Sequence, residues 1–386
     1  MNILILSSGY FPYGGAYASR LLNFCRAIEQ NNSIHVITWF DSQVDVDNLI
    51  FEICTYEHLC DSHNKIENYI LPSKLVKKAL DYINQNKVDL VISSRMPISF
   101  GSLLNLCKKK RIPLVIEQCE WIDPSNFKFN RFHPMYFLGE NNMKRRYKKA
   151  NGIIAISRLL ENHFSSQGIS TIRIPTILDV LDTEYSTKTI NQPTVISYCG
   201  SPGTSKENLK NIIETLTVVN CESVRIKLNI YGPDRNAVMK NTGYDNEHLL
   251  QIKDYVNIYG SIPQPRIAGV IKASDYTFFA RPDRQSSNAG FPTKFAESMA
   301  CGTPVITNLT GDIELYLKDG INGHVLDSIT PESINKVLCR IINESPEDRQ
   351  KLRKCARETA EISFDYRIYS SIIEKFLQSI IQETEQ

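Results

Sequence analysis

A lysine and a glutamate lie three positions apart in the stretch GFPTKFAESMACGTPVI, residues 290–306. Lys294 and Glu297 would share one face of a short helix that Pro292 begins and Gly302 ends. The N–H groups at a helix start bind phosphate oxygens, and a lysine beside them adds positive charge. A carboxylate offers acceptor oxygens and no donor, which suits the two neighbouring hydroxyl groups of a ribose. The stretch therefore predicts a site for a diphosphate joined to a sugar. The alternative is an ordinary surface ion pair between Lys294 and Glu297.

Two glycine-rich loops are placed to face the same ligand. Gly14 and Gly15 follow the first apolar segment of the chain, and Gly200 and Gly203 follow a similar segment in its second half. Glycine lets the backbone turn tightly and approach a ligand closely. Lys206 would lie near a helix start, where the helix dipole disfavours a cation unless an anion lies between them. We expect both loops to contact the ligand. The alternative is that the glycines serve only the turns and that Lys206 is solvated.

Positive side chains rather than a metal ion would neutralise the diphosphate. Arg281 follows the apolar run SDYTFFA and joins Lys206 and Lys294 as a candidate. Asp45 and Asp47 have the D-x-D spacing that can bridge a metal ion to a diphosphate. They lie in the polar stretch DSQVDVDN, and no buried strand leads into it. We therefore expect neither a metal nor another cofactor.

Alternating strands and helices would position these loops. Apolar segments typical of buried strands, such as NILILSS and SIHVITWF, alternate with helical segments such as YASRLLNFCRAIEQ. This alternation predicts an α/β protein with doubly wound, Rossmann-like parallel sheets. The polar stretch of residues 178–193 interrupts the pattern, which restarts at TVISYCG. We expect domains over residues 1–178 and 192–364 that face each other across a cleft, where the carboxyl ends of both sheets bind ligands.

The composition is that of a soluble protein with more than one core. A chain of 386 residues with 42% hydrophobic and 22% charged residues fits two domains of ordinary size. The formal net charge of +2 argues against nucleic acid as a partner. Ten scattered cysteines lack metal-ligand spacing, which favours reduced thiols in the cytoplasm. The apolar run at the start lacks a basic flank and a cleavage site, and we interpret it as a strand rather than a signal peptide.

Two basic clusters raise the question of a membrane. Residues 108–111 read KKKR, and residues 144–149 read KRRYKK. Such runs are usually solvated helix faces, but each basic residue near an anionic bilayer contributes about 1 kcal/mol of attraction. No stretch approaches the ~20 apolar residues of a spanning helix. We expect a cytoplasmic protein, with peripheral contact at the inner face of the plasma membrane as the alternative to simple solvation.

In combination, these motifs resemble the donor-site signature of glycosyltransferase family 4 and its relatives with the GT-B fold. Residues 292–306 are similar to the family pattern P-x-K-x-x-E-x-M-A-x-G-x-P-V-I, and a G-x-x-E…DG-x-NG segment follows. The Gly14-Gly15 loop resembles the family's Gly-Gly loop, and Lys206 resembles its phosphate-binding lysine. The matching residues of the signature are Pro292, Lys294, Glu297, Met299, Ala300, Gly302, Pro304, Val305, Gly311, Glu314, Asp319, Gly320, Asn322 and Gly323.

The resemblance implies a retaining glycosyltransferase with two facing GT-B domains. Such an enzyme would move a hexosyl group from a UDP- or GDP-sugar to a glycan or lipid-linked glycan, as in bacterial assembly of capsule or lipopolysaccharide. The first domain would hold the acceptor, the second the nucleotide sugar, and a helix over residues 365–386 would pack back on the first. The resemblance and the loop positions give Gly14, Gly15, Gly200, Gly203, Lys206, Arg281, Pro292, Thr293, Lys294 and Glu297 as donor-binding residues, and Lys206, Lys294 and Glu120 as catalytic residues.

The chain departs from the family pattern at three places. Ala289 stands where the family often has the first glutamate of an E-x7-E pair, which leaves the sugar contacts undefined. Ser201 and Pro202 stand where an arginine often precedes the loop lysine, and Arg281 is our candidate for the missing charge. A His-Asp pair is common in relatives after a strand of the first domain, but residues 117–121 of this chain read EQCEW instead. We assign Glu120 of this segment to face the acceptor.

Two other functions fit the same fold. A nucleotide-sugar epimerase would need acid–base carboxylates or histidines around the sugar, and the sequence offers no clear set. A catalytically inactive nucleotide-sugar-binding protein would agree with the alanine at position 289. The sequence does not define the sugar, the base, the linkage, the acceptor or the oligomeric state.

Overall fold

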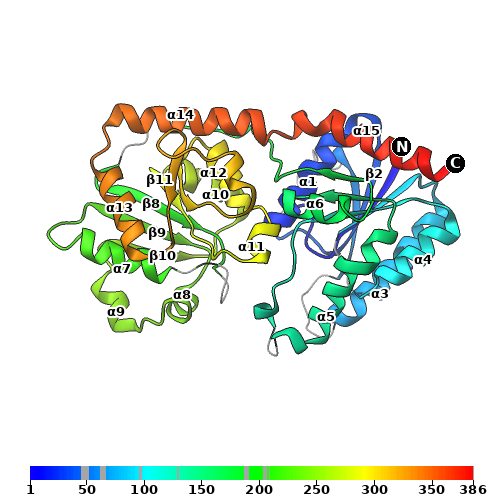
Figure 1. Cartoon of the computed structure of the whole chain (residues 1–386), viewed down its shortest axis with the longest axis horizontal. Coiled ribbons are helices and arrows are strands. Elements are labelled where there is room, and N and C mark those ends of the chain that lie inside the picture. Colours follow the sequence, from blue (N-terminus) through cyan, green and yellow to red (C-terminus); the bar gives the residue numbers. More distant parts are fainter. Residues whose placement is uncertain are drawn as a thin grey trace. The chain divides into compact units, whose positions relative to one another are not determined.

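The chain folds into two compact units in the computed structural model. The structure describes residues 1–44, 52–60, 67–94, 98–127, 130–186, 191–202, 207 and 209–385. Unit 1 comprises Met1–Leu178, Ala289–Phe291 and Tyr366–Gln386, and unit 2 comprises Asp179–Asn288 and Pro292–Asp365. Each unit holds a parallel sheet flanked by helices, so the prediction of an α/β fold with two Rossmann-like domains is confirmed (Figure 1).

Unit 1 is built on a parallel sheet of seven strands. In spatial order these are β3 (Thr55–Cys60), β2 (Ser33–Phe40), β1 (Asn2–Leu6), β4 (Leu90–Ser94), β5 (Leu114–Gln118), β6 (Gly152–Ala155) and β7 (Thr171–Arg173). Every residue of β4 and β5 is buried, as expected for strands covered on both faces. The direction of chain progression reverses between β1 and β4, and ligands bind at such a switch point in open α/β sheets.

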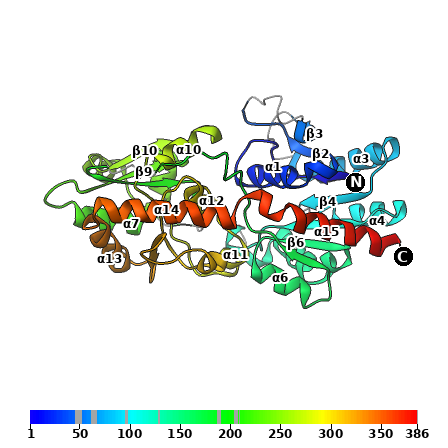
Figure 2. The same cartoon turned by 90° about the horizontal axis from the view of Figure 1, so that it is seen from above.

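Helices cover both faces of this sheet. α1 (Ala16–Ile28) and α15 (Tyr366–Glu385) lie side by side on one face (Figure 2), while α3 (Glu67–Gln85) and α4 (Phe100–Lys110) lie on the other. The last helix joins the core of unit 1, because Ile373, Phe376 and Ile380 pack in the same cluster as the strand residues. The other helical segments are η1 (Glu29–Asn31), η2 (Pro124–Asn126), η3 (Asn130–Phe132), α5 (Pro134–Asn141), η4 (Asn142–Arg146), η5 (Tyr147–Lys149) and α6 (Arg158–Ser165).

Unit 2 is built on a parallel sheet of six strands. In spatial order these are β10 (Val256–Gly260), β9 (Ile226–Tyr231), β8 (Thr194–Cys199), β11 (Tyr276–Phe278), β12 (Val305–Asn308) and β13 (Gly323–Leu326). On one face α7 (Lys210–Val219) packs against α13 (Pro331–Ile342), and on the other α12 (Thr293–Ala300) packs against α10 (Gln264–Lys272) and α14 (Pro346–Ser363). The remaining segments are α8 (Arg235–Thr242), α9 (Asn246–Gln251), α11 (Gln285–Ala289) and η6 (Gly311–Leu315).

The helix ends follow the capping chemistry of the sequence, with one difference. At the start of α14 the hydroxyl of Ser345 accepts a hydrogen bond from the N–H of Asp348 and donates one to its carboxylate. Gly302 follows α12 with a φ of 66°, the left-handed conformation that ends many helices. The start of α12 is shifted by one residue from the expectation, because Pro292 is the N-cap and Thr293 is the first helical residue.

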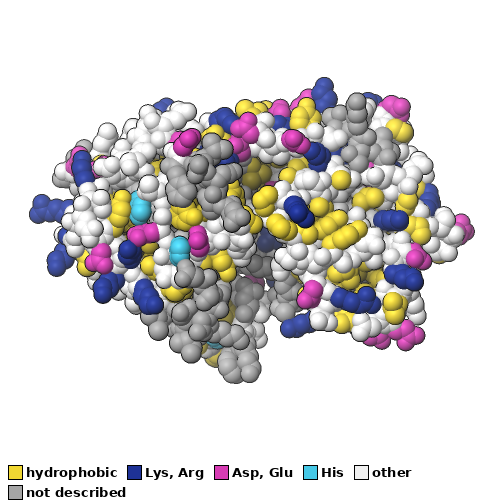
Figure 3. All heavy atoms as spheres, turned by 180° about the vertical axis from the view of Figure 1, so that it is seen from behind, with side chains coloured by type: hydrophobic (Ala, Val, Ile, Leu, Met, Phe, Trp, Pro, Cys, Tyr) yellow, Lys and Arg dark blue, Asp and Glu magenta, His cyan; other side chains and the backbone are white. Residues whose placement is uncertain are grey.

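Both basic clusters are on helical segments of unit 1. Residues 108–111 form the last turn of α4 and its C-cap, where the helix dipole favours positive charge. Residues 144–149 lie on η4 and η5. Figure 3 shows lysine and arginine side chains scattered over this face of the molecule, with acidic side chains among them. Across the described ranges, the helices lack the combination of length and apolar character needed to cross a membrane.

Candidate functional site

The ammonium group of Lys294 lies against the backbone at the carboxyl end of β8. Lys294 is the second residue of α12, and Gly200 directly follows β8. A Cβ atom on Gly200 would lie 2.8 Å from Nζ of Lys294 and 3.1 Å from its Cε, so only glycine leaves room for this side chain. Helix starts and the carboxyl ends of central strands are both places where anions bind. The structure thus brings two of the predicted donor-binding residues together.

Three side chains that the sequence did not single out hold this lysine. Oε2 of Glu207 lies 2.6 Å from Nζ of Lys294 and also accepts a hydrogen bond of 2.5 Å from the hydroxyl of Tyr198. The ring centroids of Tyr198 and Phe279 lie 4.4 and 5.5 Å from Nζ, within the range of cation–π contacts. The side chains of Lys294 and Glu207 are only 17% and 7% exposed. The alternative of a surface ion pair between Lys294 and Glu297 is therefore wrong, because the partner of Lys294 is Glu207.

Glu297 is the second charged group of α12, and its carboxyl group makes no hydrogen bond or ion pair with the described residues. Burial raises the pKa of this carboxyl to about 7, and the nearby charge of Lys294 opposes the rise. The residue is half-buried, so a ligand can reach it. A carboxyl group whose acceptor oxygens have no protein donor can accept hydrogen bonds from two hydroxyl groups of a ligand.

Arg281 lies in the loop after β11, where asparagine side chains fix the backbone. Oδ1 of Asn308 accepts a hydrogen bond of 2.9 Å from the N–H of Arg281, and its Nδ2 donates one of 2.8 Å to the carbonyl of Arg281. Asn288 accepts a hydrogen bond of 2.7 Å from the N–H of Gly311. Burial raises the pKa of the Tyr198 hydroxyl, and the positive charge of Arg281 opposes this rise. The charge of Arg281 thus acts on Tyr198, which belongs to the cluster around Lys294.

Some of the predicted groups fall where the structure gives no placement. Gly203 and Lys206 lie outside the described residues, as do Asp45 and Asp47 of the D-x-D motif. Their roles stay predictions. Within the ranges that the structure does describe, no group of three or more His, Cys, Asp or Glu side chains is arranged to hold a metal ion.

In unit 1, the Gly14-Gly15 loop joins β1 to α1. Gly15 is the N-cap of α1 with a φ of 109°, a conformation that favours glycine. A Cβ atom on Gly14 would lie 2.2 Å from Cβ of Tyr10. Both positions therefore require glycine for the turn itself, and contact of this loop with a ligand stays a prediction.

A buried cluster of unit 1 surrounds Glu117, which lies in β5. Its carboxylate accepts hydrogen bonds of 2.7 Å from Nε of Arg20 and 2.6 Å from the hydroxyl of Tyr17. The guanidinium of Arg20 also donates to two backbone carbonyl groups, and Arg20 and Glu117 are each 3% exposed. The carboxylate of Glu117 thus has both its ion-pair partner and its hydrogen-bond donors within unit 1. Glu120 follows the strand and is half-buried, and its assignment to the acceptor stays a prediction.

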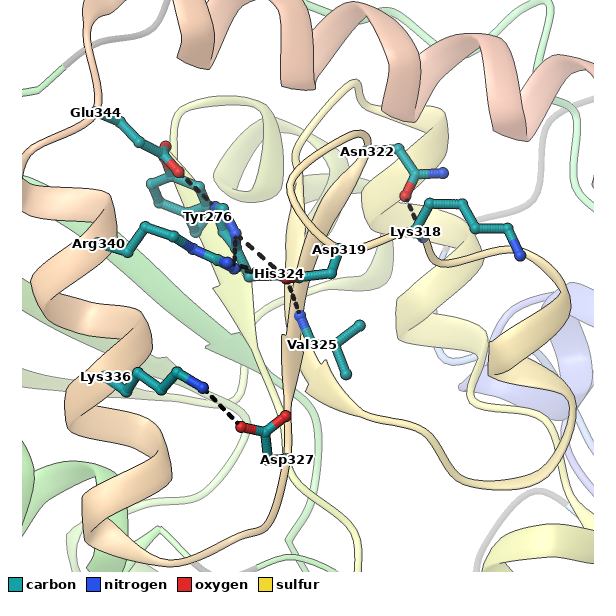
Figure 4. A network of polar contacts seen from close by, with 10 residues as sticks. All are labelled: Tyr276, Lys318, Asp319, Asn322, His324, Val325, Asp327, Lys336, Arg340 and Glu344. Carbon is teal, nitrogen blue, oxygen red and sulfur yellow. Dashed lines mark hydrogen bonds and ion pairs between the residues drawn. The ribbon is translucent and has the colours of Figure 1, made fainter.

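A second polar network of unit 2 surrounds the buried His324 of β13 (Figure 4). Arg340 donates to Nδ1 of His324 at 2.5 Å and to both oxygens of Asp319 at 2.6 and 2.9 Å. Nε2 of His324 lies 2.9 Å from Oε1 of Glu344, whose Oε2 accepts a hydrogen bond from Tyr276. Burial raises the pKa of Glu344, but its contacts with His324 and Tyr276 outweigh this, and the pKa lies below its ordinary value. Each charge faces a partner within the network, which indicates a structural role.

The DG-x-NG motif forms the turn that leads into β13. The side chain of Asn322 accepts a hydrogen bond of 2.8 Å from the N–H of Lys318 and donates one of 2.8 Å to the carbonyl of Tyr316. A Cβ atom on Gly323 would lie 2.6 Å from the carbonyl oxygen of Val305 on the neighbouring strand. These contacts show that the turn itself requires the residues of this motif.

Sequence reasoning missed Tyr198 and Glu207. Lys294 and Glu207 are 87 positions apart, and no spacing rule joins residues across that distance. The hydroxyl of Thr310, just before η6, is buried with no hydrogen-bond partner in the described part of the chain.

Residues 189–359 match the protein family described as "Glycosyl transferases group 1", a segment that contains β8, α12 and the cluster around Lys294. A D-inositol 3-phosphate glycosyltransferase of Thermomonospora curvata is 35% identical over 103 residues, which are 27% of this chain and only 22% of that relative. An uncharacterized glycosyltransferase of Methanocaldococcus jannaschii is 22% identical over 397 residues, covering 94% of this chain and 93% of that protein.

Solved structures share the fold over the whole chain. HepE of Anabaena, solved in complex with UDP and glucose, has a TM-score of 0.71 at 16% identity, with 98% of this chain and 99% of that chain covered. Identity this low shows the fold alone. The chain thus has the GT-B fold, and residues 189–359 are similar to the group 1 glycosyltransferases.

Proposed function

We propose that this chain, with its GT-B fold and its similarity to the group 1 glycosyltransferases, is a retaining glycosyltransferase. It moves a hexosyl group from a UDP- or GDP-sugar to a glycan or lipid-linked glycan, as in surface-polysaccharide assembly. The observation that carries the proposal is the placement of Lys294 and Glu297 on α12, with Lys294 against Gly200. A nucleoside diphosphate sugar fits this combination of groups. Its diphosphate would bind the lysine and the helix start, and its ribose hydroxyl groups would bind the carboxyl group.

The chain's own residues act on the leaving diphosphate and on the ribose. As the bond to the sugar breaks, negative charge grows on the diphosphate, and Nζ of Lys294 and the N–H groups at the start of α12 stabilise it. Arg281 adds positive potential, as do Lys206 and the backbone at Gly203 in our assignment. Glu297 accepts the ribose hydroxyl groups and thereby orients the nucleotide. Glu120 and the Gly14-Gly15 loop are assigned to the acceptor and the transferred sugar.

Nucleotide binding tests the donor site directly. The full chain is melted with UDP, GDP, ADP and CMP, and then with the sugars of the nucleotides that bind. A ligand that binds only the folded form raises the melting temperature by mass action. We expect UDP or GDP to do so, and Asp327→Asn, which removes an exposed partner of Lys336, to behave like the wild type. If none of the four nucleotides raises the melting temperature, the donor site is misassigned.

Product analysis separates the proposal from its two alternatives. The chain is incubated with its donor alone and then with donor and a lipid-linked glycan. A glycosyltransferase releases the nucleoside diphosphate, slowly by hydrolysis and faster with an acceptor. An epimerase instead converts the donor into a second nucleotide sugar, and an inactive binding protein leaves the donor unchanged in both reactions.

Exposed aromatic and basic side chains between residues 132 and 148 of unit 1 support a lipid-linked acceptor. Phe132 of η3 and Phe137 of α5 are 92% and 73% exposed, which is unusual for phenylalanine. The exposed Lys144, Arg145 and Lys148 follow α5 directly in sequence. Aromatic side chains enter the membrane interface, and neighbouring cations attract anionic lipid headgroups. We propose that these side chains contact the inner face of the plasma membrane.

Vesicle sedimentation tests this contact. We expect the chain to sediment with vesicles that contain phosphatidylglycerol and to stay in solution with phosphatidylcholine alone. Phe132→Ser combined with Phe137→Ser should reduce binding about tenfold. The matched control is Ile362→Ser, which removes an apolar side chain that is 76% exposed in unit 2. Equal sedimentation of all three proteins, or none by the wild type, contradicts the membrane contact.

A further inference from the structure

Lys294 occupies a position that is costly for a cation. It lies in the first turn of α12, where the helix dipole repels positive charge, and its side chain is only 17% exposed. A lysine in such a place would ordinarily turn toward solvent. Here it is held over Gly200 by the carboxylate of Glu207 and by the rings of Tyr198 and Phe279. These three side chains therefore fix the ammonium group at the carboxyl end of β8.

We propose that Glu207 is the positioning residue that aims the ammonium group of Lys294 at the leaving diphosphate. This inference rests on the proposed function. Oε2 of Glu207 is anchored by the hydroxyl of Tyr198 at 2.5 Å, so the carboxylate presents a fixed acceptor to Nζ at 2.6 Å. Its backbone is fixed as well, because its N–H donates to the carbonyl of Pro202 and its carbonyl accepts from Asn241.

The geometry leaves the lysine with capacity for a ligand. An ammonium group has three N–H donors, and one of them serves Glu207. The hydroxyl of Tyr198 is 3.5 Å from Nζ, too far for a strong second hydrogen bond. The remaining donors lie next to Gly200, where a side chain would collide with the ammonium group. Lys294 can thereby offer its positive charge to a ligand at the loop that follows β8.

Positioning and charge neutralisation predict different transfer rates for Glu207→Gln. If Glu207 only neutralised Lys294, its removal would strengthen the binding of a nucleoside diphosphate and would not slow transfer. If it positions Lys294, the variant binds the diphosphate at least as tightly as the wild type but transfers the sugar at least about tenfold more slowly. Glu207→Asp keeps the carboxylate at a shorter reach and should recover part of the rate. The exposed pair of Lys336 and Asp327 gives the control, Asp327→Asn, with unchanged rate and binding.

A double-mutant cycle decides whether Glu207 acts through Lys294. In the Lys294→Ala background, Glu207→Gln should change kcat by less than about twofold, because the group to be positioned is gone. Similar losses from Glu207→Gln in both backgrounds would overturn the inference, as would an unchanged kcat in the single variant.

A readout without substrate separates this inference from the proposed function. Lysines methylated with a ¹³C label give one NMR signal each, and the signal that Lys294→Ala removes is that of Lys294. In the wild type we expect it to differ from the signal of the exposed Lys336, and Glu207→Gln should move it toward that signal. If the signal stays in place, Glu207 does not hold Lys294. If it moves while no nucleotide binds, the proposed function fails and so does the inference that the lysine is aimed at a diphosphate.

Discussion

The two polar clusters of unit 2 use similar residues and differ in what they leave open. Around His324, Arg340 pairs with Asp319, and Glu344 pairs with His324 itself (Figure 4). Around Lys294, Glu207 matches only one donor of the ammonium group, and Glu297 has no polar partner among the described residues. A closed cluster stabilises the fold, whereas an open one retains capacity to bind a ligand. Removing side chains from each should therefore affect different properties.

The largest expected effect is on stability, in the closed cluster. His324→Ala removes a fully buried side chain and leaves Oε1 of Glu344 without its partner, which should lower the free energy of unfolding by about 4 kcal/mol. Urea unfolding measures this loss. The folded fraction of the variant should still bind the nucleotide with wild-type affinity. Weakened nucleotide binding with unchanged stability would reverse the assignments of the two clusters.

The next effect is on transfer, in the open cluster. Lys294→Ala should slow transfer at least about a hundredfold, or ~2.7 kcal/mol, because the leaving diphosphate loses its cation. Steady-state kinetics measures the rate, and circular dichroism checks that the fold is retained. Lys294→Gln keeps a hydrogen-bond donor for Glu207 and should be equally slow, since it lacks the charge. Near-normal turnover in either variant would remove Lys294 from the mechanism.

Glu297→Gln should change how the stability of the protein depends on pH. The pKa of Glu297 in the folded protein is raised from 4.5 to about 7, so between these values the folded state binds more protons than the unfolded state. The wild type should lose stability as pH rises through this window, and the glutamine variant, which does not titrate, should not. We expect the variant to be about 2 kcal/mol more stable than the wild type at pH 8 and equally stable at pH 4. Parallel pH profiles would show that the Glu297 carboxyl is not buried as described.

Tyr198→Phe should give the smallest effect. It removes the hydroxyl that anchors Glu207 but keeps the ring beside Nζ of Lys294. We expect a loss of about 1 kcal/mol in transition-state stabilisation, seen as a lower kcat with little change in the melting temperature. A loss as large as that of Lys294→Ala would show that the hydroxyl itself contacts the ligand.

The sequence predicted the fold well because its signals are local. Buried strands such as β1 and β4 read as apolar runs, and the Ser345 cap of α14 needs only residues three positions apart. The start of α12 was misplaced by one residue, because proline is acceptable both at the N-cap and at the first helical position.

The site was predicted only in part because its contacts are not local. Lys294 and Glu297 were identified because they belong to a recognisable motif. Gly200 was identified because it directly follows a predicted strand. The alternative of an ion pair between Lys294 and Glu297 was wrong, and the sequence did not reveal the actual partner: residues three apart on a helix can pair, but the ammonium group pairs with a carboxylate 87 positions away. The DG-x-NG motif was interpreted as part of a donor-site signature. In the structure, the side chain of Asn322 instead forms hydrogen bonds with the backbone of the turn.

Calorimetric titration of UDP and GDP tests the central claim, that the open cluster of unit 2 holds a nucleoside diphosphate. It compares the wild type with Lys294→Gln and with Lys336→Ala, an exposed lysine of the same unit. The account predicts that the wild type and Lys336→Ala bind one of the two nucleotides with the same Kd, and that Lys294→Gln binds it at least about tenfold more weakly. Equal affinity in all three proteins would contradict it.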